Sequence, residues 1–270
     1  ADGNYVQRSK RSIVMRGERL KPLLYERALA LGVRIVNHVN VTHVLQDEHG
    51  RAAGIAGFEA RDGQPLLVSS RAVLIATGGA SGIYRPSNPG TARKKTWYCP
   101  YNAGSGMAMG LRIGAEMTSF ESRYIALRTK DLIAPTGTLA LGTNVQQVNA
   151  RGDLYLQQTA ALLGRRLTTC ERLFYEREEN REGRGPCMMD LSDFTPRQYH
   201  EMICNYLDMS PGLVLQLLEY LDNPCMQIEV SASEPYINGG HGSAGYWVDV
   251  HRQTTVPNLY AAGDTVGGAP

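Results

Sequence analysis

Three stretches of this sequence combine glycines with a hydroxyl or carboxylate side chain. They read ATGGASGIY at 76–84, NAGSGMAMG at 102–110 and LYAAGDTVGG at 259–268. Glycines let a ligand approach the backbone closely, and the free N–H groups at the start of a helix attract an anion. In the last stretch Asp264 follows an apolar strand, where a carboxylate can accept a sugar or ribitol hydroxyl. Each stretch alone could be a tight turn or a close packing contact; together they favour a nucleotide-binding site.

Three further side chains have the chemistry to bind an anion or a flat ring. Arg128, in ESRYIALRTKD, can hold a carboxylate, sulfate or phosphate through two parallel hydrogen bonds, or can lie at the surface. His241 stands between glycines in NGGHGSAG and has no bulky neighbours in the sequence, with an exposed loop position as the alternative. Trp97 can belong to a core or can stack on an aromatic ring. These residues predict a small anionic substrate.

The composition excludes several classes of function. The chain has 270 residues, of which 43% are hydrophobic and 20% charged. Its net charge of +2 is too small to attract nucleic acid or an anionic membrane electrostatically. The five cysteines form no C-x-x-C motif and no histidine pair has metal-ligand spacing, so we predict neither a disulfide framework nor a metal site. No apolar run approaches the roughly 20 residues of a membrane span. We therefore expect a cytoplasmic protein.

Periodicity predicts the elements that position these stretches. Residues 18–31 place leucines on one face of a helix that Gly32 would end. Alternating and β-branched residues predict strands at 33–47, 52–60, 64–70 and 72–80. Further helices are expected at 103–117, 158–182, 196–209 and 213–221. Glycine-punctuated, strand-rich segments therefore flank a more helical middle, which is typical of a nucleotide-binding domain into which another domain is inserted.

Several of these pieces, in this order, resemble the flavoprotein subunits of the fumarate reductase/succinate dehydrogenase superfamily. The pieces are ATGG, AGSGMAMGLRIGAEM, GRGPCMMDL, the glycine-flanked His241 and PNLYAAGD. The stretch 91–131, from TARKKTWYCPYNAGS to ALRTKD, is most similar to one branch, the alpha subunit of dissimilatory adenylylsulfate reductase. That branch has a Trp, an N-A-G-S helix start and an R-x-K-D stretch in the same arrangement. The resemblance covers most of the chain.

The resemblance implies an α/β plus α+β fold, a partial Rossmann-like FAD-binding domain interrupted by a capping domain. The FAD-binding domain would occupy 1–122 and return at 237–270, with the capping and substrate domain at 123–236. It implies that FAD is contacted by Val41, Ala76, Thr77, Gly78, Ser105, Gly106 and Asp264. It also implies a substrate pocket beside the flavin, formed by Trp97, Arg128, Leu141 and His241.

In that branch the flavin attacks the sulfur of adenylylsulfate and releases sulfite and AMP, drawing electrons from an iron–sulfur partner subunit. Arg128 and His241 would be the catalytic residues, because both can stabilise anionic oxygens as charge develops. The H-P-T-G stretch of the dicarboxylate enzymes is missing; residues 134–137 read APTG. A fumarate reductase-, succinate dehydrogenase- or aspartate oxidase-like enzyme remains the alternative.

The G-x-G-x-x-G that follows the first strand of a dinucleotide-binding fold is not found after any of the strands expected at 33–47, 52–60, 64–70 and 72–80. The resemblance therefore predicts that the chain is an internal fragment of a longer flavoprotein and is inactive alone. A third possibility is a folded module that binds no flavin and catalyses nothing.

Overall fold

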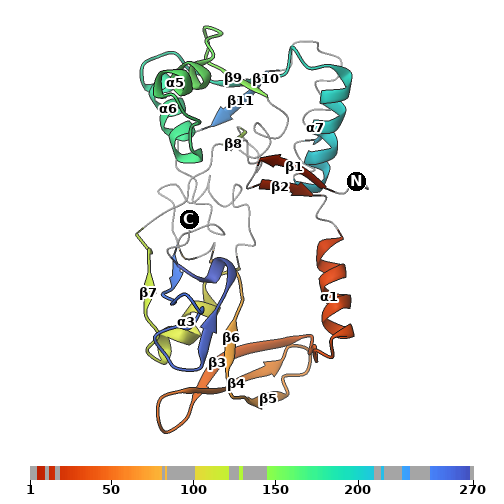
Figure 1. The fold of residues 1–270 in the computed structure, drawn as a ribbon, viewed down its shortest axis with the longest axis vertical. Coiled ribbons are helices and arrows are strands. Elements are labelled where there is room, and N and C mark those ends of the chain that lie inside the picture. The colour runs from red at the N-terminus through yellow and green to blue at the C-terminus, as the bar shows by residue number, and fades with distance from the viewer. Residues whose placement is uncertain are drawn as a thin grey trace.

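The computed structural model describes ten segments of the chain, drawn as coloured ribbon in Figure 1. They are residues 5–9, 12–15, 19–80, 83, 101–121, 128–129, 145–209, 214–215, 227–231 and 244–267. The elements β3 to β6, α3 and β13 gather at one end of the view, and α5, α6 and β8 to β11 gather at the other.

The first half of the chain forms an antiparallel meander and one strand of a parallel pair. The meander consists of β3 (Val39–Gln46), β4 (Ala52–Glu59) and β5 (Pro65–Ser69), in that spatial order. β6 (Val73–Ile75) pairs in parallel with β13 (Leu259–Ala261), with Leu74 opposite Tyr260. The parallel pair brings two distant parts of the chain together.

The glycine-rich helix α3 (Ser105–Arg112) is shorter than the expected 103–117. Gly104 precedes it with a φ of 82°, and Gly114 follows it with a φ of 88°, a left-handed conformation that ends a helix. The chain then enters β7 (Met117–Thr118), which pairs with β12 (Gly245–Tyr246). A short 3₁₀ helix, η1 (Gly263–Thr265), follows β13.

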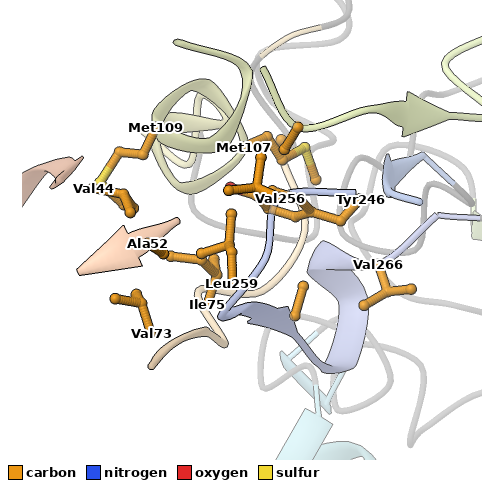
Figure 2. Packing of buried hydrophobic residues seen from close by; sticks show 13 residues of the cluster. Val44, Ala52, Val73, Ile75, Met107, Met109, Tyr246, Val256, Leu259 and Val266 are labelled. Atoms are coloured by element: carbon orange, nitrogen blue, oxygen red, sulfur yellow. The ribbon is translucent and has the colours of Figure 1, made fainter. Parts of the chain in front are cut away.

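These elements share one hydrophobic core, the first core, shown in Figure 2. Its buried residues are Val44, Ala52, Val73, Ile75, Ala80, Met107, Met109, Ala115, Tyr246, Val256, Leu259, Ala261 and Val266. Tyr246, Leu259 and Ala261 have no exposed surface. Residues from 44–115 and from 246–266 therefore pack together in one unit.

The middle of the chain forms a second sheet covered by helices. Its antiparallel strand order is β8 (Arg128–Thr129), β11 (Gln227–Ser231), β10 (Met188–Asp190), β9 (Gln146–Val148). The helices are α5 (Tyr155–Leu163), α6 (Thr169–Arg181) and α7 (Pro196–Met209). The second core consists of Val145, Tyr155, Leu156, Leu167, Leu173, Cys187, Met189, Leu191, Met202, Val214, Ile228 and Val230.

Local sequence explains where these helices begin and end. The single helical zone expected at 158–182 was wrong, because Gly164 takes a φ of 63° and ends α5. α6 restarts with a capping box in which Thr168 and Glu171 bond each other's backbone. The expected start of α7 is confirmed, since Thr195 and Gln198 make the same reciprocal bonds. Of the helix expected at 213–221 the structure describes residues 214–215, which are helical.

The amino-terminal elements are a hairpin, β1 (Tyr5–Ser9) with β2 (Ser12–Met15), and the helix α1 (Leu20–Ala30). The helix expected at 18–31 is confirmed, yet none of its residues is buried. The strand expected at 33–47 was wrong in its first part, because residues 33–37 are irregular and β3 begins at Val39. His38 has a φ of 60°, which an extended strand cannot contain.

The strand expected at 72–80 is confirmed for the three residues of β6.

Because α1 is exposed, we expect its leucines to contribute little to the free energy of unfolding. We expect Leu24→Ala to change the free energy of unfolding by no more than about 0.5 kcal/mol, because Leu24 is 61% exposed and leaves no cavity. Urea denaturation of the two proteins measures the difference. A loss above about 2 kcal/mol, typical of a core leucine, would contradict the exposure of this face.

Candidate functional site

The first two glycine-rich stretches lie against each other. A Cβ atom on Gly106 would overlap the hydroxyl of Thr77. The first turn of α3 can therefore lie this close to the residue after β6 only because position 106 is a glycine. A Cβ on Gly104 would lie 3.2 Å from Cγ2 of Ile83, which follows the same strand. Gly78 has a φ of 78°, a turn conformation that favours glycine. The structure therefore joins Thr77 directly to Gly106.

The third stretch lies beside the first because β13 runs parallel to β6. The Ala262 N–H donates to the Ile75 carbonyl at 3.0 Å, which continues this pairing to the residue before η1. Gly263 has a φ of 76°, and Asp264 lies exposed in η1. The Thr265 side chain is fully buried, and its Oγ1 has no hydrogen-bond partner among the described residues. The carboxyl ends of β6 and β13 therefore lie side by side, followed by the glycines of the first and third glycine-rich stretches.

A buried tyrosine connects α3 to the end of the chain. The Gly110 N–H donates to the Tyr246 hydroxyl at 3.0 Å, and that hydroxyl donates to the Gly106 carbonyl at 2.6 Å. Burial raises the pKa of Tyr246 to about 12, so the phenol is neutral and can donate at neutral pH. A Cβ on Gly110 would overlap the tyrosine ring.

A cavity of about 270 Å³ lies between β3 and α3. Its lining residues are Asn40, Val41, Thr42, Ala103, Ser105, Ala108, Met109 and Arg112. Val41 and Ser105, both predicted to contact FAD, therefore line the same space. Ser105, Ala108 and Arg112 follow helical spacing on one face of α3, and that spacing could have identified Arg112, which we did not predict.

A β-bulge shapes one wall of this cavity. Val41 pairs with Gly57 but His43 pairs with Ala56, so Thr42 is an extra residue on β3. The Arg112 guanidinium donates to the Thr42 carbonyl at 3.3 Å and so holds the bulge against α3.

These features fit part of a dinucleotide site. The described lining residues are neutral except Arg112, and Gly104 and Gly106 flank the lining residue Ser105 at the start of α3. Ala76 and Thr77 are exposed beside the first turn of α3. Within the described ranges, no three His, Cys, Asp or Glu side chains gather closely enough to hold a metal ion. The residues present suit a flat, hydrogen-bonding nucleotide group.

The structure describes little of the predicted substrate pocket. Trp97, Leu141 and His241 lie outside the described residues. Arg128 begins β8, where it pairs in register with Ser231, and its side chain is not described.

The second core holds a polar cluster apart from the glycine-rich stretches. Arg184 binds both carboxylate oxygens of Glu179, with Nη2 to Oε1 at 2.6 Å and Nε to Oε2 at 2.8 Å, and Asn149 donates to Oε2 at 2.8 Å. Burial raises the pKa of the Cys187 thiol to about 12, which keeps it unreactive. Tyr155, whose pKa burial also raises, donates to Gln147 Oε1 at 3.4 Å. Through these bonds Glu179 links α6 to the turn that contains Asn149 and to Arg184, which follows the helix.

Residues 4–269 match the model of the FAD binding domain family, and the chain belongs to that family. Among curated proteins it is 30% identical to adenylylsulfate reductase subunit alpha of Megalodesulfovibrio gigas, over 94% of this chain and 42% of the relative. It is 24% identical to L-aspartate oxidase of Streptomyces coelicolor, over 92% of this chain and 41% of that protein. The chain thus spans less than half the length of these relatives.

Solved structures give the same result. Adenylylsulfate reductase from Archaeoglobus fulgidus superposes with a TM-score of 0.76 at 29% identity, over 98% of this chain and 48% of that one. A quinol fumarate reductase from E. coli superposes with a TM-score of 0.70 at 16% identity, over the same shares of both chains, which shows the fold alone. These matches confirm the predicted flavoprotein superfamily, the mixed α/β FAD-binding fold and FAD as the cofactor.

No helix within the described ranges is both long and apolar enough to cross a lipid bilayer.

Proposed function

We propose that the intact protein is an FAD-dependent oxidoreductase and that this chain supplies one part of its FAD site. The observation that carries the proposal is the convergence of Val41 and Ser105 on one cavity, with Thr77 packed against Gly106 beside it. The family membership of residues 4–269 supports the cofactor. FAD, when bound, supplies two-electron transfer to a substrate.

The chain's own residues would bind and orient this cofactor. The N–H groups at the start of α3 face an electron-rich group, since they have no partner within the helix. The neutral cavity wall around Val41 takes a flat ring, and Asp264 accepts a hydroxyl of the ribitol or ribose. The close contact of Thr77 with Gly106 leaves little room for water between these walls.

We propose adenylylsulfate as the substrate, cleaved with two electrons to sulfite and AMP. The 30% identity to an adenylylsulfate reductase subunit alpha and the TM-score of 0.76 support this branch. Arg128 and His241 would bind the anionic oxygens, with Trp97 and Leu141 completing the pocket. An iron–sulfur subunit would deliver the electrons, and we place the protein in the cytoplasm.

Turnover by the intact protein tests the substrate. With a reducing dye as electron donor, we expect sulfite and AMP to form from adenylylsulfate in equal amounts, and no succinate to form from fumarate. Reduction of fumarate without cleavage of adenylylsulfate would contradict the proposal. It would establish the second candidate, a dicarboxylate flavoenzyme, which the match to L-aspartate oxidase favours.

We expect Arg128→Met to lower kcat/KM for adenylylsulfate about 100-fold, because a positioned cation that stabilises developing charge contributes on that scale. The FAD content of the variant should equal that of the unchanged protein. Arg197→Met is a matched control, because Arg197 lies exposed on α7 and pairs with Glu201. Equal kinetics in both variants would remove Arg128 from the catalytic set.

The third possibility concerns this chain by itself. We expect the isolated 270-residue chain to carry no flavin, as a module that by itself supplies only part of the FAD site. A visible absorption spectrum with flavin bands after purification would contradict this expectation.

A further inference from the structure

We propose that Tyr246 is a positioning residue for FAD, because its hydroxyl bonds two backbone groups of α3 while its own backbone pairs with the third glycine-rich stretch. The proposal rests on the proposed function, which places the start of α3 beside the cofactor. Tyr246 does not line the described cavity. It would act through Ser105 and Gly106.

The hydroxyl joins two groups that a regular α-helix joins directly. The N–H of residue 110 and the carbonyl of residue 106 are four positions apart, the spacing of a helical hydrogen bond. Here Gly110 donates to the phenol oxygen at 3.0 Å, and the phenol donates to Gly106 at 2.6 Å. A buried side chain bonded to both groups holds this part of α3 at a fixed distance from β12. The position of Gly106 therefore depends on this hydroxyl.

The tyrosine ring is itself held rigidly. Tyr246 has no exposed surface, and the missing Cβ of Gly110 provides the space that its ring occupies. Figure 2 shows Tyr246 among the buried residues of the first core. A phenol oxygen that both accepts and donates has its main hydrogen-bonding capacity filled.

The backbone of Tyr246 is tied to the third glycine-rich stretch. Its carbonyl accepts from the Gly267 N–H at 3.0 Å, and it forms a parallel bridge with Val266. The preceding Gly245 approaches the Thr265 carbonyl so closely that a Cβ would overlap it. One residue therefore sets the distance between the start of α3 and the turn that carries Asp264. Both segments are predicted to contact FAD, so their separation determines how well the cofactor fits.

Tyr246→Phe in the intact protein tests this role, because phenylalanine keeps the ring and removes only the hydroxyl. Without it, α3 loses both of its hydrogen bonds to Tyr246, so the start of the helix is no longer held at its distance from the third glycine-rich stretch. We expect the Kd for FAD to rise about 10-fold, the scale of one hydrogen bond. Titration of the flavin-stripped protein with FAD, followed by flavin fluorescence, measures this.

Tyr155→Phe is the matched control. Tyr155 is also buried, but it belongs to the second core, and its hydroxyl donates to Gln147 at 3.4 Å. We expect this variant to lower the melting temperature while the Kd for FAD stays within about twofold. An equal effect of both variants on the Kd would overturn the proposal, because it would show that only general stability matters.

The remaining outcomes are also decisive. If the unchanged protein binds no FAD, the proposed function itself fails. If it binds FAD and Tyr246→Phe binds equally tightly, only the positioning role fails. Should Tyr246→Phe not fold, Tyr246→Met repeats the comparison with a flexible apolar side chain. Failure of both variants to fold would overturn the proposal in favour of a structural role.

Discussion

Replacing Leu259 with alanine is expected to lower the free energy of unfolding by about 4 kcal/mol, within the range for buried leucines. Leu259 has no exposed surface and begins β13, where it pairs with Val73. The neighbouring residues of the first core come from β6, α3 and the segment after β12, so they cannot all move into the cavity that alanine leaves. Urea denaturation followed by circular dichroism gives the difference.

Leu74→Ala is the control for this prediction. Leu74 lies on the neighbouring strand, one position along, and is 61% exposed. We expect its replacement to cost no more than about 0.5 kcal/mol. Equal losses in the two variants would mean that β13 and β6 are not packed in the way the first core requires.

Replacing Arg184 with methionine is expected to cost about 3 kcal/mol, because it leaves a buried carboxylate without its cation. The Glu179 side chain is 11% exposed, and Arg184 contacts both of its oxygens. Asn149 alone cannot replace the lost charge. Arg181→Met is the control, since Arg181 is 72% exposed and pairs with Glu178 at the surface. A similar loss in both variants would contradict the burial of the Glu179 pair.

The same pair predicts a pH dependence. Hydrogen bonds from Arg184 hold the pKa of Glu179 below its ordinary value of 4.5, against the opposing effect of burial. A lowered pKa stabilises the folded state above the unfolded pKa, and this contribution is lost as the pH falls through the folded value. The difference between the unchanged protein and Arg184→Met should therefore be largest near neutral pH and shrink below about pH 4. A difference that stays constant down to pH 3 would contradict this.

The glycine-rich stretches can be recognised in the sequence because their constraint is local. A residue with no room for a Cβ atom has to be glycine, so Gly106 could be singled out before its contact with the Thr77 side chain was known. The helix starts at Thr168 and Thr195 depend on the next three residues alone, so they too can be read from the chain.

Non-local contacts account for the failure at residues 33–37, whereas the failure at 158–182 was local, because Gly164 and the capping box at Thr168 divide that zone into two helices. Residues 33–37 have the composition of a strand, but a strand needs a neighbour to pair with, and composition does not reveal whether one is present. The bulge at Thr42 and the hydrogen bonds of Tyr246 to α3 depend on residues outside the local sequence. Arg112 could have been found from its helical spacing with Ser105, whereas nothing local marks Tyr246.

The FAD content of the intact protein after purification tests the proposed FAD site most directly. The convergence of Val41 and Ser105 on one cavity, with Thr77 packed against Gly106 beside it, predicts one FAD per chain, released as FAD on denaturation. A correctly folded intact protein that carries no flavin and binds none on addition of FAD would contradict the central claim.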